Sequence, residues 1–155
     1  MNIFMPDKQP YLSIIALDDR RLNKQILECK TILDVALDET KKGYAKHPVV
    51  VYYKDYPNFV MWYGFSCCVE YLIRFDKFHK LHNYFDEHFW EAVRYEKVKP
   101  FYCEGSKTDP NCIRTTENTV ELFRQKLCKK WDNDKIPPKW TNREQPIWYK
   151  RKEVK

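Results

Sequence analysis

A run of apolar residues at helical spacing near the start of the chain constrains the fold more than any other feature. Between Asp18 and Glu39 these residues recur every three or four positions, at Leu22, Ile26, Cys29, Leu33, Ala36 and Leu37. Such spacing puts them on one face of an α-helix, and that face must be buried against other elements. Asp18 or Asp19 is a suitable N-cap for this helix, and Gly43 lies near its expected end.

Other segments extend the helical prediction along the chain. We expect an apolar helix over about Phe59–Phe75, a second helix over Asp76–Tyr95 and a third over Glu117–Lys130. The inner face of the second should carry Phe78, Leu81, Phe85, Phe89 and Val93. Val49–Tyr53 is predicted as a short helix or an extended piece, and Lys97–Arg114 as irregular. The predicted fold class is therefore all-α.

A compact single-domain helical bundle over residues 1–155 accounts for this pattern. The length of 155 residues is close to the commonest domain size and large enough to bury a core without a metal or disulfide. Aromatic residues make up 16% of the chain, so we expect a core built around Trp, Tyr and Phe. Residues 131–155 mix three prolines with aromatic and basic residues, which predicts a proline- and aromatic-rich C-terminal arm that wraps the helices.

Composition and motifs exclude several classes of site. The three glycines are too few for a glycine-rich phosphate loop. No C-x-x-C or H-E-x-x-H motif occurs, and His79 and His82 lack further ligands at a workable spacing, so no metal and no cofactor is expected. Met1–Pro10 does not have the pattern of an export signal, and no apolar run reaches membrane length. We therefore expect no membrane association, a cytoplasmic protein and six reduced, mostly buried cysteines.

The positive charge gathers toward the C-terminal end. Lys and Arg outnumber Asp and Glu by 28 to 22, and nine against four of these residues lie between Lys129 and Lys155. One interpretation is a segment that contacts phosphates, with Trp148, Lys150 and Arg151 meeting the ligand. The other is a solvated basic terminus whose aromatic residues only pin the arm to the core. Both interpretations stay open on the sequence.

The polar face of the first long helix carries candidate chemistry. The periodicity that buries its apolar face places on the opposite stripe Arg21, Lys24, Gln25, Glu28 and Thr31. Lys24 and Glu28 are four residues apart and can touch. An amine beside a carboxylate suits Schiff-base chemistry at a sugar aldehyde carbon, with the carboxylate moving protons and arginines such as Arg20 holding phosphates. The alternative is a solvent-facing helix side with an ordinary ion pair, and periodicity alone favours that alternative.

Four short motifs, in this order, resemble one family of proteins. They are Met1–Phe4 (MNIF), Asp19–Glu28 (DRRLNKQILE), Gly43–Pro48 (GYAKHP) and Lys139–Lys150 (KWTNREQPIWYK). Together they resemble the pyrimidine-dimer DNA glycosylases of the endonuclease V type, and the last motif is similar to the phage branch. The resemblance implies a compact all-helical domain that binds damaged duplex DNA and flips a base out of the stack. It also implies catalysis by an N-terminal amine, a first-helix glutamate and a neighbouring arginine, without a metal.

Two positions depart from the family's pattern. The family's consecutive Arg-Glu pair aligns best with Lys24-Gln25, and a glutamine cannot shuttle a proton as a glutamate does. The available carboxylate is Glu28, one turn further on. Because Met followed by a residue as large as Asn2 is normally retained, the free amine is expected to belong to Met1. The resemblance therefore supports the predicted fold and class of ligand more strongly than it supports the predicted reaction.

Two hypotheses follow. The first is a DNA glycosylase/AP lyase-like protein that acts on damaged or modified bases, with Met1 or Lys24 as nucleophile and Glu28 as acid/base. The residues expected to bind nucleic acid or a nucleotide are Asn2, Arg20, Arg21, Gln25, His47, Trp148, Lys150 and Arg151. The second is a non-catalytic binder of DNA or a nucleotide with the same fold, such as a phage protein that sequesters a nucleotide immune signal. Either would be a monomer or a small homo-oligomer, with DNA or a nucleotide as its partner.

Overall fold

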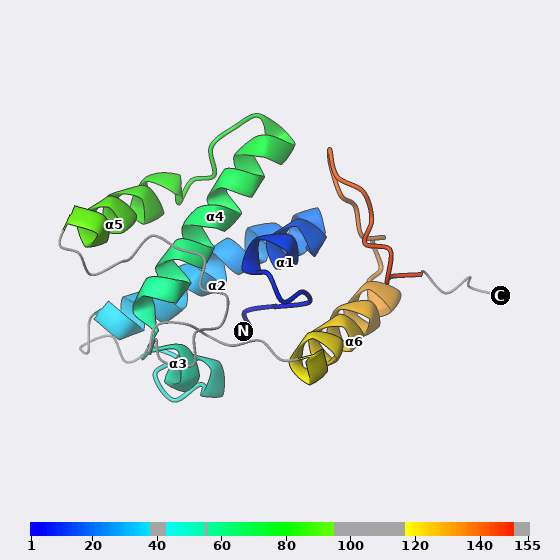
Figure 1. The fold of residues 1–155 in the computed structure, drawn as a ribbon, viewed down its shortest axis with the longest axis horizontal. Helices are drawn as coiled ribbons and strands as arrows, with labels where there is room; N and C mark the ends of the chain where they lie inside the picture. Colours follow the sequence, from blue (N-terminus) through cyan, green and yellow to red (C-terminus); the bar gives the residue numbers. More distant parts are fainter. Residues whose placement is uncertain (38–42, 55, 95–116, 151–155) are drawn as a thin grey trace.

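Helices make up the regular structure of the residues that the computed structural model describes, which are 1–37, 43–54, 56–94 and 117–150. They are α1 (Pro10–Ala16), α2 (Asp19–Leu37), α3 (Pro48–Tyr53), α4 (Pro57–Phe75), α5 (His82–Arg94) and α6 (Glu117–Asn133) (Figure 1). No strand occurs in these ranges, so the all-α prediction is confirmed. The expectations for Lys97–Arg114, Cys103, Cys112 and Arg151 lie outside the described residues.

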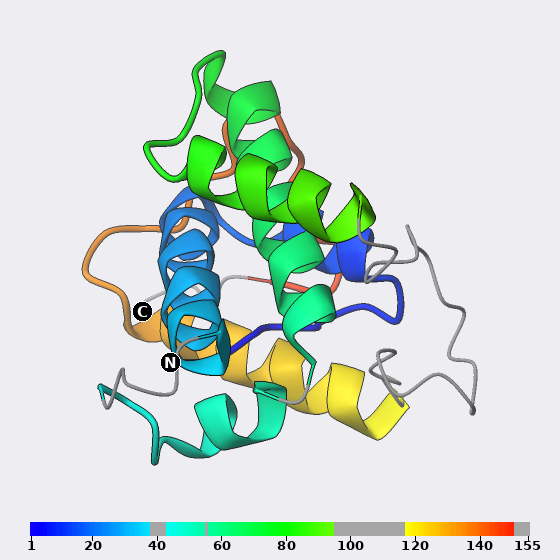
Figure 2. The ribbon, with the colours of Figure 1, turned by 90° about the vertical axis from the view of Figure 1, so that its left-hand side faces the viewer.

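The core lies between α2 and α4, which pack against each other at the centre of the molecule (Figure 2). Four of the predicted apolar positions of α2 are fully buried, namely Leu22, Ile26, Cys29 and Leu33, whereas Ala36 is only partly buried and Leu37, at the end of the helix, is 55% exposed. Helix α4 also packs against α1 and α5, while α3 packs on α2. Because α4 has neighbours on several sides, it is apolar around most of its circumference, as a central helix must be.

Two helix boundaries near the ends of the chain differ from the predictions. The sequence predicts no helix before Asp18, yet Pro10–Ala16 form α1, with Pro10 in the first turn where its missing N–H is no loss. Helix α6 continues past Lys130 to Asn133. Trp131 is therefore helical and 1% exposed, and its indole Nε1 donates a hydrogen bond of 2.7 Å to the Asp18 carboxylate. The C-terminal arm begins after α6, at residue 134.

Helix α5 begins at His82 and not at Asp76 as predicted. Asp76 has a left-handed backbone with φ of 51°, which ends α4. The turn that follows is fixed by the buried His79, whose Nδ1 accepts a hydrogen bond of 3.1 Å from the backbone N–H of Leu81. The prediction that Phe78 lies on an inner helix face is wrong: the side chain sits in this turn and is 64% exposed.

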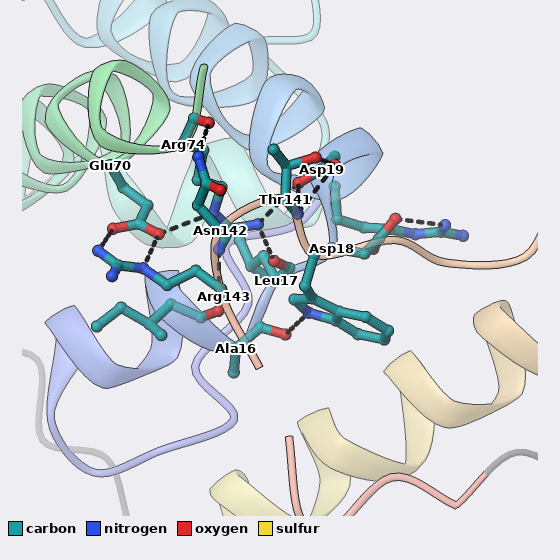
Figure 3. A network of polar contacts seen from close by, with 12 residues as sticks. Ala16, Leu17, Asp18, Asp19, Glu70, Arg74, Thr141, Asn142 and Arg143 are labelled. Carbon is teal, nitrogen blue, oxygen red and sulfur yellow. Dashed lines mark hydrogen bonds and ion pairs between the residues drawn. The ribbon is translucent and has the colours of Figure 1, made fainter. Parts of the chain in front are cut away.

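The C-terminal arm is attached to α2 and α4 by a network of polar contacts (Figure 3). The guanidinium of Arg143 donates two hydrogen bonds, of 2.8 and 2.9 Å, to the carboxylate of Glu70. Arg74 donates to the same carboxylate at 2.7 Å. The Thr141 hydroxyl donates to Asp19 at 2.7 Å. These contacts hold the arm against the end of α4 and the start of α2.

Aromatic packing reinforces the attachment of the arm. The rings of Trp131 and Trp148 are stacked, with centroids 5.5 Å apart, and Tyr149 lies 4.7 Å from Trp131. Trp140 donates from its indole Nε1 to the Ala16 carbonyl at 3.0 Å. The expectation of an aromatic-rich core therefore holds in the region where α6, the arm and the start of α2 meet.

Gly64 is required by the close packing of α4 and α5. A Cβ at this position would lie 2.2 Å from Cε1 of the buried Phe85. Alanine normally stabilises a helix centre by about 1 kcal/mol over glycine, but here the Phe85 ring must move. We expect Gly64→Ala to lower the free energy of unfolding by about 1–3 kcal/mol. In the matched variant Gly43→Ala the new Cβ meets nothing within 4 Å. Urea denaturation would measure both, and a more stable Gly64→Ala protein would contradict this packing.

The Glu70 carboxylate should be the strongest electrostatic anchor of the arm. Burial acts to raise its pKa, but hydrogen bonds from Arg143 and Arg74 outweigh burial and hold the pKa below its ordinary value. Glu70→Gln leaves the fully buried Arg74 guanidinium with Asp19 as its remaining ionic partner, which should cost about 1–3 kcal/mol of unfolding free energy. The difference in unfolding free energy between the unmodified protein and Glu70→Gln should have its full size above pH about 4.3, the ordinary glutamate pKa. This difference should shrink as the pH falls through the lower pKa that Glu70 has in the folded state.

A matched control is the exposed ion pair of Lys8 and Glu117, whose side chains are 58% and 76% exposed. Lys8→Gln should change the unfolding free energy by less than about 1 kcal/mol. Urea denaturation at several pH values would compare the two variants. Equal effects of both substitutions, or an effect of Glu70→Gln that does not depend on pH, would contradict the role given to Glu70.

Candidate active site

Gln25 attaches the N-terminal segment to α2. Its side-chain Nε2 donates to the Asn2 carbonyl at 3.0 Å, and its Oε1 accepts from the Phe4 backbone N–H at 3.1 Å. Gln25 is only 1% exposed, so its predicted place on the polar stripe is wrong. The physical reason is its spacing: Leu22 and Cys29, three and four residues away, put Gln25 on the core side, where backbone groups satisfy its amide.

Glu28 lies between two amines. Its Oε2 accepts a hydrogen bond of 3.0 Å from the Asn2 backbone N–H, and its Oε1 lies 3.6 Å from the amino group of Met1. Lys24 Nζ lies 3.8 Å from the same Oε1. The side chains of Met1 and Glu28 are 7% and 12% exposed, whereas that of Lys24 is 66% exposed. The amine of Met1 and the carboxylate therefore share a mostly enclosed site, with the lysine at its outer edge.

A hollow of about 320 Å³ opens beside this pair. It is bounded by the N-terminal segment, α2 and α6, and its lining residues are Met1, Asn2, Phe4, Arg20, Arg21, Lys24, Glu28 and Lys130. Four of these side chains are cationic and one is a carboxylate. A hollow with this balance favours an anionic ligand.

The two arginines of the hollow differ in how far they are already paired. Arg21 donates to Asp134 and lies 3.5 Å from Asp18. Burial acts to lower its pKa, but the hydrogen bond to Asp134 and the charges of both aspartates raise it overall. Arg20 is 55% exposed and lies 3.8 Å from Asp134. Arg21 is thus largely occupied in joining α2 to the end of α6, whereas Arg20 remains accessible from solvent.

The other predicted binding residues do not line the hollow. His47 caps α3, where its Nδ1 accepts a hydrogen bond of 3.2 Å from Val49 N–H. Trp148 packs against Trp131, with the guanidinium of Arg124 5.5 Å from its ring. Lys150 is exposed on the arm. Trp148 therefore packs as expected if the aromatic residues of the arm attach the arm to the core, which was the alternative to a direct contact with the ligand.

Sequence reasoning missed Lys130, which lines the hollow from α6. It belongs to the basic segment Lys129–Lys155, but no periodicity relates a helix near residue 130 to one near residue 24. Contacts between the end of α6 and the start of α2, of Trp131 with Asp18 and of Asp134 with Arg21, bring it to the site. A long-range contact of this kind leaves no local pattern in a single sequence.

Among the described residues, the buried cysteines are not suited to act as nucleophiles. Burial raises the pKa of the Cys68 thiol to about 12, and Cys29 and Cys67 are fully buried with raised pKa values as well. Such thiols are poor nucleophiles because the reactive thiolate is scarce. Within the described ranges, no group of three or more His, Cys, Asp or Glu side chains could hold a metal ion, and no helix is long and apolar enough to cross a membrane.

Residues 1–95 match the profile of pyrimidine dimer DNA glycosylases. This segment covers more than half of the chain and contains the N-terminal segment and helices α1 to α5, but not α6 or the arm. No curated protein and no solved structure matches the chain significantly. From the match, the chain belongs to the pyrimidine dimer DNA glycosylase family.

Proposed function

We propose that the protein is a DNA glycosylase/AP lyase that uses the amine of Met1 as nucleophile and Glu28 as acid/base. Membership of the family implies DNA binding and a glycosylase-like function. The observation that carries the proposal is the 3.6 Å separation of the Met1 amine and the Glu28 carboxylate, in a hollow lined by cations. Gln25 stands where the family has its glutamate, but this does not leave the site without an acid/base, because Glu28 supplies the carboxylate beside the amine.

The arrangement supports a definite sequence of steps. The amine attacks C1′ of the sugar as the glycosidic bond to the base breaks, and ring opening leaves an imine between the amine and C1′. A carboxylate beside that carbon can protonate the ring oxygen and later remove a proton from C2′, so that the 3′ phosphate leaves by elimination. At an abasic site the imine forms directly from the aldehyde, with loss of water. The two protons that the amine loses go to the ring oxygen, by way of the carboxylate, and to the departing base. The bond-breaking steps thus need only an amine and a carboxylate, and water finally hydrolyses the imine to release the protein.

Met1 is a better nucleophile candidate than Lys24. Met1 is held in place, because the N–H of the next residue, Asn2, donates a hydrogen bond to Glu28 and the Met1 amine lies 3.6 Å from the same carboxylate. The Lys24 side chain is largely in solvent. The assignment requires Met1 to be the first residue of the protein with a free amine, and an intact-mass measurement checks this.

The exposed cations at the edge of the hollow are suited to hold the DNA backbone. Arg20, Lys24 and Lys130 line the hollow from two helices, and a sugar in the hollow carries a phosphate on each side. Lys150 and Arg151 remain proposals for contacts further along the duplex.

Glu28→Gln tests the proposed acid/base directly. The glutamine carbonyl can still accept from Asn2 N–H, so the fold should persist, but proton transfer is lost. We expect cleavage of a duplex oligonucleotide with one abasic site to slow by about 100-fold or more. Lys24→Gln, four residues earlier on the helix, should weaken DNA binding but retain most of the single-turnover cleavage rate when the DNA is saturated with protein. Full activity of Glu28→Gln, or no cleavage by the unmodified protein, would rule out the proposed reaction.

Lys130 and its neighbour form a matched pair on α6. Lys130 lines the hollow, while Lys129 is exposed and does not. Lys130→Gln should weaken binding to an uncleavable abasic duplex and reduce the slope of log affinity against log salt by about 1. Lys129→Gln should change both quantities less. Fluorescence anisotropy at several salt concentrations measures them, and identical behaviour of the two variants would mean that the hollow does not hold a phosphate.

One observation favours the second candidate function, a non-catalytic nucleotide binder. The hollow of about 320 Å³ falls at the lower end of the range of about 300–1,000 Å³ found for small-molecule sites. A cationic hollow of that size fits one nucleotide. Calorimetry with a panel of nucleotides separates the two functions: micromolar binding with the nucleotide recovered unchanged, and no cleavage of abasic DNA, would favour this binder.

A further inference from the structure

A second surface, around α3, carries aromatic side chains that the core does not use. We call it the α3 surface, and its exposed residues are Tyr44, Lys46, Val51, Tyr52 and Lys54. Tyr44 is 64% exposed and Tyr52 is 54% exposed. The opposite side of the same helix is buried in the core through Val50 and Tyr53. The tyrosines are therefore displayed by a helix that is itself firmly attached.

The backbone of Tyr44 is strained. Its φ of 61° is left-handed, a conformation that bulky side chains rarely adopt. The turn is closed by a hydrogen bond of 2.8 Å from the His47 N–H to the Tyr44 carbonyl, and the two rings meet edge-on at 6.5 Å. A strained residue with a mostly exposed side chain contributes little to folding, and such residues cluster where a protein binds a ligand.

The α3 surface lies next to the candidate active site. Helix α3 packs on α2, and Tyr53 shares the core with Cys29, the residue after Glu28. Figures 1 and 2, taken at right angles, both show α3 beside the N-terminus. The segment from Gly43 to Lys54 contains two lysines and a histidine and no acidic residue. This surface therefore has the charge of a nucleic-acid contact, and it lies beside the N-terminus, whose first residues line the hollow.

We infer that the α3 surface contacts the same DNA as the hollow, with Tyr44 and Tyr52 stacking on bases next to the reacting nucleotide. This inference rests on the proposed function. An enzyme that takes a nucleotide out of the stack exposes the faces of neighbouring bases, and aromatic rings bind such faces without regard to sequence. Lys46 and Lys54 would contact the flanking phosphates.

Substitutions of the tyrosines should separate DNA binding from folding. Tyr52→Ala and Tyr44→Gly should each weaken binding to an uncleavable abasic duplex roughly tenfold, the scale of one stacked base. Tyr44→Gly should leave thermal stability unchanged or raised, because glycine tolerates positive φ. A merely structural tyrosine would not combine retained stability with lost affinity. Because no charge changes, the salt dependence of binding should stay that of the unmodified protein.

Phe78→Ala is the matched control, since Phe78 is as exposed as Tyr44 and lies in the turn between α4 and α5. In both views this turn is at the far end of the molecule from α3. The control should bind DNA normally. A 2-aminopurine beside the abasic site should brighten on binding the unmodified protein, which reports unstacking, and change less with the tyrosine variants.

The outcomes distinguish the two proposals. Suppose that cleavage depends on Glu28, but that Tyr44→Gly and Tyr52→Ala bind DNA normally and give the normal 2-aminopurine signal. This result would overturn the proposed DNA contact of the α3 surface and leave the proposed function standing. Equal loss of affinity in Phe78→Ala would overturn it too. An unmodified protein that neither binds nor cleaves abasic duplexes would overturn the proposed function and this inference together.

Discussion

Two side chains of α2 determine where the N-terminal amine lies. Gln25 binds the carbonyl of Asn2 and the N–H of Phe4, and Glu28 binds the N–H of Asn2. Because Gln25 and Glu28 are one helical turn apart, together they bind both polar backbone groups of Asn2. Leaving a buried polar group unpaired costs about 1–3 kcal/mol, so the register of this segment on the helix is well specified. The short distance between the Met1 amine and Glu28 follows from that register.

The helix that carries these residues is itself positioned by parts of the chain outside the family match. Asp18 accepts a hydrogen bond from Trp131 of α6, and Asp19 accepts one from Thr141 of the arm. From within the matched residues, Arg74 of α4 also donates to Asp19 and to the Leu17 carbonyl. Helix α6 thereby acts twice, since it supports the start of α2 and supplies Lys130 to the hollow. The C-terminal third of the chain thus helps to build the site, although the family match does not include it.

The sequence predicted the parts of the fold that local patterns control. Helices α2, α4 and α6 follow from apolar spacing. The resemblance to the family indicated an N-terminal amine, which made Met1 a candidate, and the polar stripe of the first long helix offered Glu28 as the carboxylate in place of Gln25. The predictions that were wrong depend on distant partners. His79 contacts Asn23 and holds a turn where a helix was expected. Gln25 has the spacing of a core position, and its polar amide is tolerated there because backbone groups of a remote segment satisfy it. Lys130 reaches the hollow through a contact spanning 113 residues. None of these partners can be identified from periodicity.

The central claim is that the amine of Met1, positioned by Gln25 and activated beside Glu28, forms the covalent bond to DNA. Borohydride reduces an imine to a stable amine and so records which nitrogen attacked. The protein would be incubated with an abasic duplex and borohydride, digested with protease and nuclease, and the adduct located by peptide mass spectrometry. The account predicts a sugar adduct on the N-terminal nitrogen of Met1. An adduct on Lys24, or the absence of any adduct while the strand is cleaved, would contradict it.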